Sequence, residues 1–252
     1  MTEAAEHPFD REWLERVLRS TEGKCVLVGG QALAFWADRF RIASLRTRGE
    51  DAFVTRDADF LGTRESVLAL ARATAGHAHF PNQRAPTSLV GQIRIAAGND
   101  AVLNIDVLHR LLGPTAEGVR RRAQAVQLGD VEFLVMHPVD VLHSRVENLA
   151  RLKDKQTTEG VAQARIAAQV ARAFILEVAS QGSRGQRQAL RAIERIAEIA
   201  RTGSGKKVIR KFGVDLLAAI PAEAVTNRSF HEKRWPALRR SFEQVRKRPL
   251  GG

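Results

Sequence analysis

A short apolar run, Cys25–Val28, leads directly into Gly29 and Gly30 and then into a second apolar stretch, Ala32–Trp36. Four apolar residues ended by glycine are typical of a buried strand, and the second stretch contains no helix breaker, so it predicts a helix. Strand, glycine turn and helix therefore follow one another without a linker. The first half of the chain must accordingly combine a sheet with helices.

The rest of the first half alternates between strand-like and helical segments. A helix is predicted to begin after Asp10, and another after Thr63, since both residues are good N-caps. The expected strands are Val54–Leu61, the hairpin Leu89–Ala96 with Val102–Leu108, and the hairpin Ala125–Leu128 with Val131–Val135. Gly98 to Asp100 and Gly129 to Asp130 supply the turns. The fold class predicted for this half is α+β with a mixed or antiparallel sheet flanked by helices.

The second half of the sequence reads almost wholly as helices separated by glycine or proline. Pro138 suits the first turn of a helix that continues to about Leu152. The further helices are predicted at Val161–Ser180, Ser183–Arg201, Lys206–Ala219 and Phe230–Val245. A chain of 252 residues is long enough for two modest domains, and we place them at 1–136 and 137–252.

The charge balance limits the partners that suit this chain. Lys and Arg number 40 against 28 Asp and Glu, which gives a net charge of +12 and implies a polyanionic partner: nucleic acid, a nucleotide or an acidic protein. Cys25 is the only cysteine, so neither an internal disulfide nor a cysteine zinc site can form. No uninterrupted apolar run approaches membrane-spanning length, and the first ten residues carry acids instead of an apolar leader. We expect a soluble, cytoplasmic protein with no membrane partner.

Three aspartates stand out by their positions in predicted strands. Asp57 and Asp59 are two residues apart, so the strand period places both carboxylates on one face. Two carboxylates that close repel each other unless a cation bridges them, and Mg²⁺ is the natural partner for such oxygen ligands. Asp106 occupies the polar face of a later strand, where aspartate is disfavoured. The three acids are therefore candidate metal ligands for phosphoryl or nucleotidyl transfer; taken without the other motifs, Asp57 and Asp59 also suit a solvated acidic turn.

Gly29 and Gly30 supply the complementary half of such a site. Lacking side chains, they allow close approach of the backbone to phosphates, and the helix that follows directs free N–H groups at an anion. A tight strand-to-helix turn without a ligand is the simpler explanation for a glycine pair alone. The order of glycine pair, acid pair and third acid favours the phosphate site.

The motifs Val28–Leu33, Thr55–Phe60 and Ile105–Val107 resemble the nucleotidyltransferase superfamily of the DNA polymerase β type. The similarity is greatest to the bacterial minimal nucleotidyltransferases that include the AbiEii toxins of type IV toxin–antitoxin and abortive-infection systems. It covers about 24–107 and extends loosely through the helix that begins at Pro138.

The resemblance implies a role for each motif. Gly29 and Gly30 would bind the triphosphate of a nucleotide, and Gln31 and Thr55 belong to the same nucleotide-binding motifs, although the superfamily commonly has Ser or Thr where Gln31 stands. Asp57, Asp59 and Asp106 would hold two Mg²⁺ ions, or Mn²⁺, and Asp106 would promote deprotonation of the acceptor.

Two basic residues of the second half complete the candidate nucleotide-binding set. Arg145 and Lys153 lie eight positions apart, about two helical turns, and fit loosely the downstream helical signature of the toxins. A solvated basic face is an equally good interpretation of this spacing.

Two functions follow from these observations. The first is metal-dependent transfer of a nucleoside monophosphate from a nucleoside triphosphate to a macromolecular acceptor, with tRNA favoured, in a toxin–antitoxin or abortive-infection setting. The alternative is a catalytically weak module of the same fold that binds nucleic acid or an acidic antitoxin through basic clusters such as Lys206–Lys211 and Lys233–Arg240.

Overall fold

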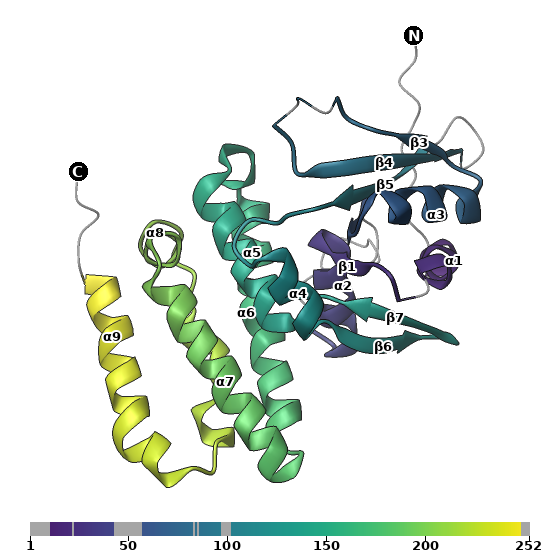
Figure 1. Cartoon of the computed structure of the whole chain (residues 1–252). Coiled ribbons are helices and arrows are strands. Elements are labelled where there is room, and N and C mark those ends of the chain that lie inside the picture. The colour runs from purple at the N-terminus through teal and green to yellow at the C-terminus, as the bar shows by residue number, and fades with distance from the viewer. Residues whose placement is uncertain are drawn as a thin grey trace. The chain divides into compact units, whose positions relative to one another are not determined.

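The computed structural model describes residues 11–21, 23–42, 57–82, 84, 86–96 and 102–247. The chain divides into two compact units, one formed by residues 1–38 and 43–137 and the other by 39–42 and 138–252. The architecture is α+β, with a seven-stranded mixed sheet flanked by helices and a helical C-terminal region (Figure 1). The predicted fold class is confirmed at this level.

The sheet of the first unit has the strand order β3-β4-β5-β2-β1-β7-β6. Parallel pairing joins β2 to β5 and β1 to β7, and all other neighbours are antiparallel. The strands are β1 (Val26–Val28), β2 (Asp57–Leu61), β3 (His77–His79), β4 (Leu89–Ala96), β5 (Val102–Leu108), β6 (Gln124–Leu128) and β7 (Val131–Val135). The non-consecutive order places strands from distant parts of the chain beside β2.

Both predicted hairpins are present, as β4 with β5 and β6 with β7. The predicted strand Val54–Leu61 is described from Asp57 onward, and its first three residues lie outside the described part of the chain. The sequence analysis missed β3, which has only three residues, two of them histidines. A segment that short carries too little alternation to be recognised.

Among the described residues, four helices belong to the first unit: α1 (Arg11–Thr21), α2 (Gly29–Arg39, whose last residue belongs to the second unit), α3 (Arg64–Thr74) and α4 (Ala116–Arg122). The backbone N–H of Thr63 donates to Ser66 Oγ at 3.1 Å, which fixes the start of α3 where the sequence predicted it. Helices α1 and α3 pack against each other, and α3 also packs on β4. The core between helices and sheet includes Leu14, Phe60, Leu70 and Ile93, each at most 1% exposed.

Helix α2 is held at its far end by aromatic side chains. The rings of Phe35 and Phe133 meet edge to face with centroids 5.2 Å apart, and Trp36 Nε1 donates to the Met136 carbonyl oxygen at 2.8 Å. All residues of α2 from Gln31 to Ala37 are buried. The helix is thereby fixed against β7, and with it the glycine turn from which it starts.

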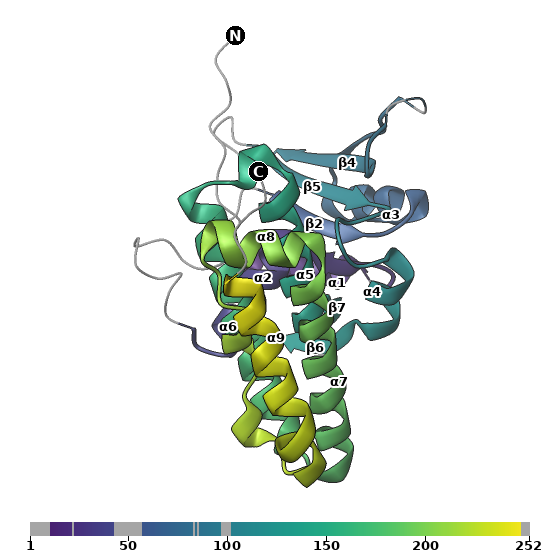
Figure 2. The same cartoon turned by 90° about the vertical axis from the view of Figure 1, so that its left-hand side faces the viewer.

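The second unit is built around α5 (Pro138–Arg151), which packs against α6 (Thr158–Ala179), α7 (Gly182–Arg201) and α8 (Gly203–Phe212). The last helix, α9 (Trp235–Lys247), packs against α7 and α8 and follows a π-helical turn at Phe230–Arg234. Figure 2 shows α9 alongside α7 from a second direction. No helix in the described segments is long and apolar enough to span a membrane.

One helix prediction was wrong in its bounds. The helix expected at Lys206–Ala219 is α8, which ends at Phe212, and residues Leu217–Ala219 form a separate 3₁₀ turn. Gly213 ends the helix because it adopts a left-handed conformation with φ of +61° and its N–H bonds to the Val208 carbonyl. Gly213 is the feature of the sequence that could have indicated the end of this helix, and the prediction of a longer helix did not take it into account.

Candidate active site on the polar face of the sheet

The pairing of four strands aligns eight polar residues in two rows across one face of the sheet. Register pairs join His79 to Gln92, Gln92 to Asp106, and Asp106 to Asp59; a second series joins His77 to Arg94, Arg94 to Asn104, and Asn104 to Asp57. The row between them, Ala78, Ile93, Ile105 and Ala58, belongs to the opposite face, since side chains alternate along each strand. Ile93, Ile105 and Ala58 are fully buried. In strands β2 to β5 one face is thus core, and the other is largely polar. On that polar face, Val28 of β1 (the register partner of Asp59) and Leu61 of β2 are buried apolar residues.

Two of the three predicted acids are brought together at one end of these rows. Asp59 on β2 is the register partner of Asp106 on β5, although the two residues are far apart in sequence. Neighbouring strands lie about 4.8 Å apart, so the two carboxylates start from adjacent backbone positions on one face. Asp57 pairs with Asn104, two residues along the same strands from the pair of Asp59 and Asp106. Only the backbone of Asp57 is described.

The carboxylate of Asp106 is oriented by a residue that the sequence analysis missed. Gln92 Nε2 donates to Asp106 Oδ1 at 2.9 Å, and Arg94 Nε donates to Gln92 Oε1 at 3.0 Å. Because Arg94 needs the amide oxygen, the amide nitrogen is directed at the carboxylate. The polar alternation of Gln92 and Arg94 with Ile93 was visible in the sequence, but the facing acid depends on the register of β4 and β5.

The glycine turn adjoins the acids directly. Gly29 is the first residue of α2 and has φ of +66°, and a Cβ atom added to it would lie 2.0 Å from Asp59 Oδ2. Only glycine satisfies both the backbone conformation and this contact. The beginning of α2, where helix N–H groups have no intrahelical acceptor, is therefore beside the Asp59 carboxylate.

The other predicted nucleotide-binding residues have different placements. Gln31 lies in the first turn of α2 with a fully buried side chain, and Thr55 lies outside the described residues. Arg145 and Lys153 belong to the second unit and not to one helix, because α5 ends at Arg151 and Lys153 begins a 3₁₀ turn. Arg145 is 9% exposed, and its Nη1 donates to Gln163 Oε1 at 3.0 Å. The expected shared helical face for these two cations is thus wrong.

The donor atoms of the acid site suit a hard cation. Asp59 and Asp106 are direct register partners, and both offer carboxylate oxygens. Oxygen ligands favour Mg²⁺ or Mn²⁺ over transition metals that prefer nitrogen or sulfur. Among the side chains described, no three His, Cys, Asp or Glu residues gather closely enough to hold a metal ion. The side chain of Asp57, the third predicted ligand, is not among those described.

The single cysteine is unsuited to nucleophilic chemistry. Cys25 is buried immediately before β1, and this burial raises the pKa of its thiol, an effect that a hydrogen bond with Ser66 partly opposes. A thiol with a raised pKa forms little of the reactive thiolate at neutral pH.

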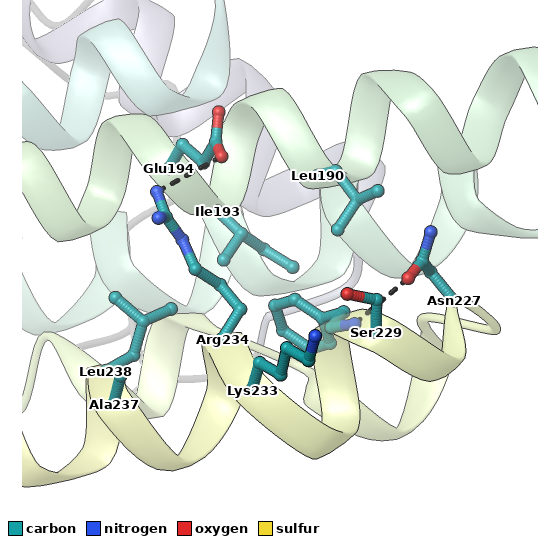
Figure 3. Close-up of a pocket in the computed structure, with 10 residues that line it drawn as sticks. Leu190, Ile193, Glu194, Asn227, Ser229, Lys233, Arg234, Ala237 and Leu238 are labelled. Carbon is teal, nitrogen blue, oxygen red and sulfur yellow. Dashed lines mark hydrogen bonds and ion pairs between the residues drawn. The ribbon is translucent and has the colours of Figure 1, made fainter.

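The second unit has a groove of its own between α7 and α9, with a volume of about 440 Å³ (Figure 3). Leu190 and Ile193 of α7 and Leu238 of α9 form its apolar floor. Lys233 and Arg234 lie at its rim, and Arg234 Nη2 contacts Glu194 Oε1 at 3.2 Å. The groove combines an apolar floor with a charged edge, at which Arg234 is paired with Glu194 and Lys233 adds one further positive charge.

The predicted basic cluster Lys206–Lys211 divides into two kinds of residue. Lys207 Nζ donates to the Ala150 carbonyl at 2.5 Å, and Arg210 Nε donates to the Val245 carbonyl at 2.7 Å. These two side chains bind the last turns of α5 and α9 and are only half exposed, whereas Lys206 is exposed. Half of the cluster therefore has a structural role.

No model of a known protein family matches the chain, and no curated protein matches it either. The resemblance of the three motifs to nucleotidyltransferases therefore stays a prediction.

Proposed function

We propose that this chain is a metal-dependent nucleotidyltransferase with the fold of the DNA polymerase β type. It would transfer a nucleoside monophosphate from a nucleoside triphosphate to a hydroxyl group of a macromolecular acceptor. The observation that carries the proposal is the pairing of Asp59 with Asp106 on adjacent strands, directly beside Gly29 at the start of α2. An acid pair and a helix N-terminus at one point suit a cation and a phosphate together.

Each part of the site has a defined task in this reaction. Gly29, Gly30 and the first N–H groups of α2 would receive the triphosphate, while Asp57, Asp59 and Asp106 would hold Mg²⁺ or Mn²⁺. When bound, these ions would neutralise phosphate charge and lower the pKa of the acceptor hydroxyl. The acceptor oxygen bonds to the α-phosphorus, the bond from that phosphorus to the bridging oxygen breaks, and pyrophosphate leaves. Asp106, oriented by Gln92, receives the hydroxyl proton and passes it to water.

The charge of the protein favours a polyanionic acceptor, with tRNA first among the candidates. The net charge is +12, and α7 exposes Arg184, Arg187 and Arg191 at positions spaced for one helical side. Such a surface attracts nucleic acid and repels a cationic small-molecule acceptor at long range. A role as a cytoplasmic toxin of a toxin–antitoxin or abortive-infection system is part of this proposal.

A second function, binding without efficient catalysis, is favoured by the groove of the helical unit. Its apolar floor and Lys233 at its rim suit an acidic protein partner, such as an antitoxin, or a nucleic acid, and such a partner would compete with Glu194 for Arg234. The buried position of Gln31, where the resemblance leads one to expect a phosphate-binding hydroxyl, also favours this alternative.

A transfer assay separates the two functions. The full chain is incubated with Mg²⁺, total bacterial RNA and each α-labelled nucleoside triphosphate in turn, and both labelled RNA and released pyrophosphate are measured. We expect one nucleotide to label RNA with stoichiometric pyrophosphate, and the Asp106→Asn variant to do neither. RNA binding without pyrophosphate release from any nucleotide would select the binding module instead.

A further inference from the structure

The acid pair uses only one end of the two polar rows. The rows continue from Asp106 and Asn104 through Gln92 and Arg94 on β4 to the two histidines of β3. Strand β3 is the last strand on this side of the sheet, so the rows reach its edge. Three steps between neighbouring strands separate β2 from β3, which is about 14 Å at the usual strand spacing. The polar surface therefore extends well beyond the acid pair, across β4 and β3.

The side chains change along the rows from carboxylates to an amide, one guanidinium and two imidazoles. Arg94, His77 and His79 are exposed, while Gln92, Asn104 and Asp106 are half-buried. Within the described part of the chain, Arg94 forms no ion pair with a carboxylate, and its hydrogen bond to Gln92 uses Nε and not the two terminal guanidinium nitrogens. A guanidinium with those donors is a phosphate ligand, because its planar fork matches phosphate oxygens.

The residue types also differ from those of a merely solvated strand surface. None of the eight positions holds Thr, which is common in strands, or Lys, which is common on exposed edge strands. The outer positions hold an amide, a guanidinium and two imidazoles, groups that bind phosphates, sugar hydroxyls and base edges, and imidazole also stacks on unpaired bases. These groups continue directly from the acids at which transfer would take place.

We propose that this outer surface, formed by His77, His79, Gln92 and Arg94, holds the single-stranded end of an RNA acceptor. Arg94 binds a phosphate close to the reacting hydroxyl, and the two histidines contact the nucleotides that follow. This inference rests on the proposed function, since it supplies the acceptor track for that same site. It names β4 and β3 as the elements that position the acceptor.

The test compares Arg94→Gln with Arg72→Gln in the full chain. The first substitution keeps an amide donor for Gln92 Oε1 but removes the positive charge. Arg72 is a matched control, because it is an exposed arginine whose Nε also makes one hydrogen bond, to the Leu68 carbonyl, on α3. The probe is a fluorescein-labelled single-stranded RNA of about 12 nucleotides, within the usual site size of single-strand binding proteins. Its affinity is measured by fluorescence anisotropy over a range of salt concentrations.

We expect Arg94→Gln to weaken RNA binding by about tenfold at low salt and to reduce the log–log salt slope by about 0.7, the contribution of one single-strand phosphate. A His77→Ala, His79→Ala double variant should weaken binding with little change in slope. Arg72→Gln should match the wild type, and Mn²⁺ affinity measured by calorimetry should be the same in all four proteins. Wild-type RNA affinity and slope in Arg94→Gln would overturn the proposal.

Two further outcomes separate this proposal from the proposed function. RNA binding that depends on Arg94, in a protein that releases no pyrophosphate, would keep the track and refute the transferase. A Mn²⁺-dependent loss of tripolyphosphate binding in Arg94→Gln, with RNA affinity unchanged, would assign Arg94 to the nucleotide and refute the track.

Discussion

The two units differ in the partner that they provide for a buried or half-buried aspartate. In the helical unit, Asp140 of α5 is fully buried and forms an ion pair with Arg195 of α7. In the sheet unit, Asp106 is half-buried, lies opposite a second aspartate and takes its hydrogen bond from the neutral amide of Gln92. A carboxylate whose charge is balanced by an arginine of the same unit is a structural element. A carboxylate that is oriented by an amide beside another carboxylate receives no balancing charge from Gln92, and the proposed function assigns that role to a cation.

The largest expected effect comes from breaking the ion pair of the helical unit. Arg195→Leu leaves Asp140 buried without this partner, and we expect the unfolding free energy to fall by about 3 kcal/mol. Urea denaturation followed by circular dichroism measures the change. The double variant with Asp140→Leu should recover part of the loss, since it removes the buried charge. A loss below about 1 kcal/mol in the single variant is what an exposed ion pair contributes, and it would show that this pair has no structural role.

Substitutions in the acid pair of the sheet unit should lower activity without lowering stability, the reverse of the effect expected in the helical unit. Asp59→Asn and Asp106→Asn each remove a proposed metal ligand, so we expect nucleotidyl transfer to fall by at least about 100-fold. Thermal midpoints should stay level or rise, because the substitution relieves repulsion between the carboxylates. Asp130→Asn is the control, since Asp130 is an exposed aspartate of the same unit whose pKa is lowered by its contact with Arg19. Transfer at the wild-type rate in both site variants would remove the acids from the reaction.

Much of the sheet unit could be predicted because its signals are local. The strand, glycine turn and helix at residues 25–36 and the two hairpins follow from neighbouring residues. The contact of Gln92 with Asp106 could not be predicted, because it requires the register of β4 against β5, and the pairing of Asp59 with Asp106 requires a parallel register between distant strands. Composition does not fix a register.

In the helical unit the helices were predictable and the roles of their charges were not. The sequence shows Lys206 and Lys207 as equivalent neighbours, yet Lys207 binds the Ala150 carbonyl and Lys206 is exposed. Arg145 and Lys153 were placed on one helical face, but α5 ends between them. Both differences depend on where a helix ends and on what packs beside it, and such contacts are not visible in a single sequence.

Gly29→Ala tests the close contact between the glycine turn and the acid pair. The added Cβ would lie against Asp59 Oδ2, so we expect the affinity for Mn²⁺ with tripolyphosphate to fall by about tenfold, equal to about 1.4 kcal/mol. Gly23→Ala is a matched control, because Gly23 has φ of +71° and nothing within 4 Å of an added Cβ. Both variants should lose about 1 kcal/mol of stability from the left-handed backbone, and only Gly29→Ala should lose affinity. Equal affinity for Mn²⁺ with tripolyphosphate in the two variants would show that the glycine turn is not part of the binding site.

The smallest effects are expected from single charge reversals on α8. Lys206→Glu should weaken single-stranded RNA binding several-fold and lower its salt dependence, while stability stays the same. Lys207→Glu should instead reduce stability by about 1 kcal/mol, because it removes a hydrogen bond to the end of α5. RNA anisotropy and urea denaturation of both variants give the comparison. If Lys206→Glu leaves RNA binding unchanged, the exposed face of α8 is not part of the acceptor surface.

Calorimetric titration of Mn²⁺ in the presence of inorganic tripolyphosphate is the most direct test of whether Asp59 and Asp106 form a cation and phosphate site. It needs neither the acceptor nor the identity of the base. The account predicts saturable binding to the wild type and to Asp130→Asn, and at least a tenfold loss of affinity in Asp59→Asn and in Asp106→Asn. Equal affinity in all four proteins, or no binding to any of them, would contradict it.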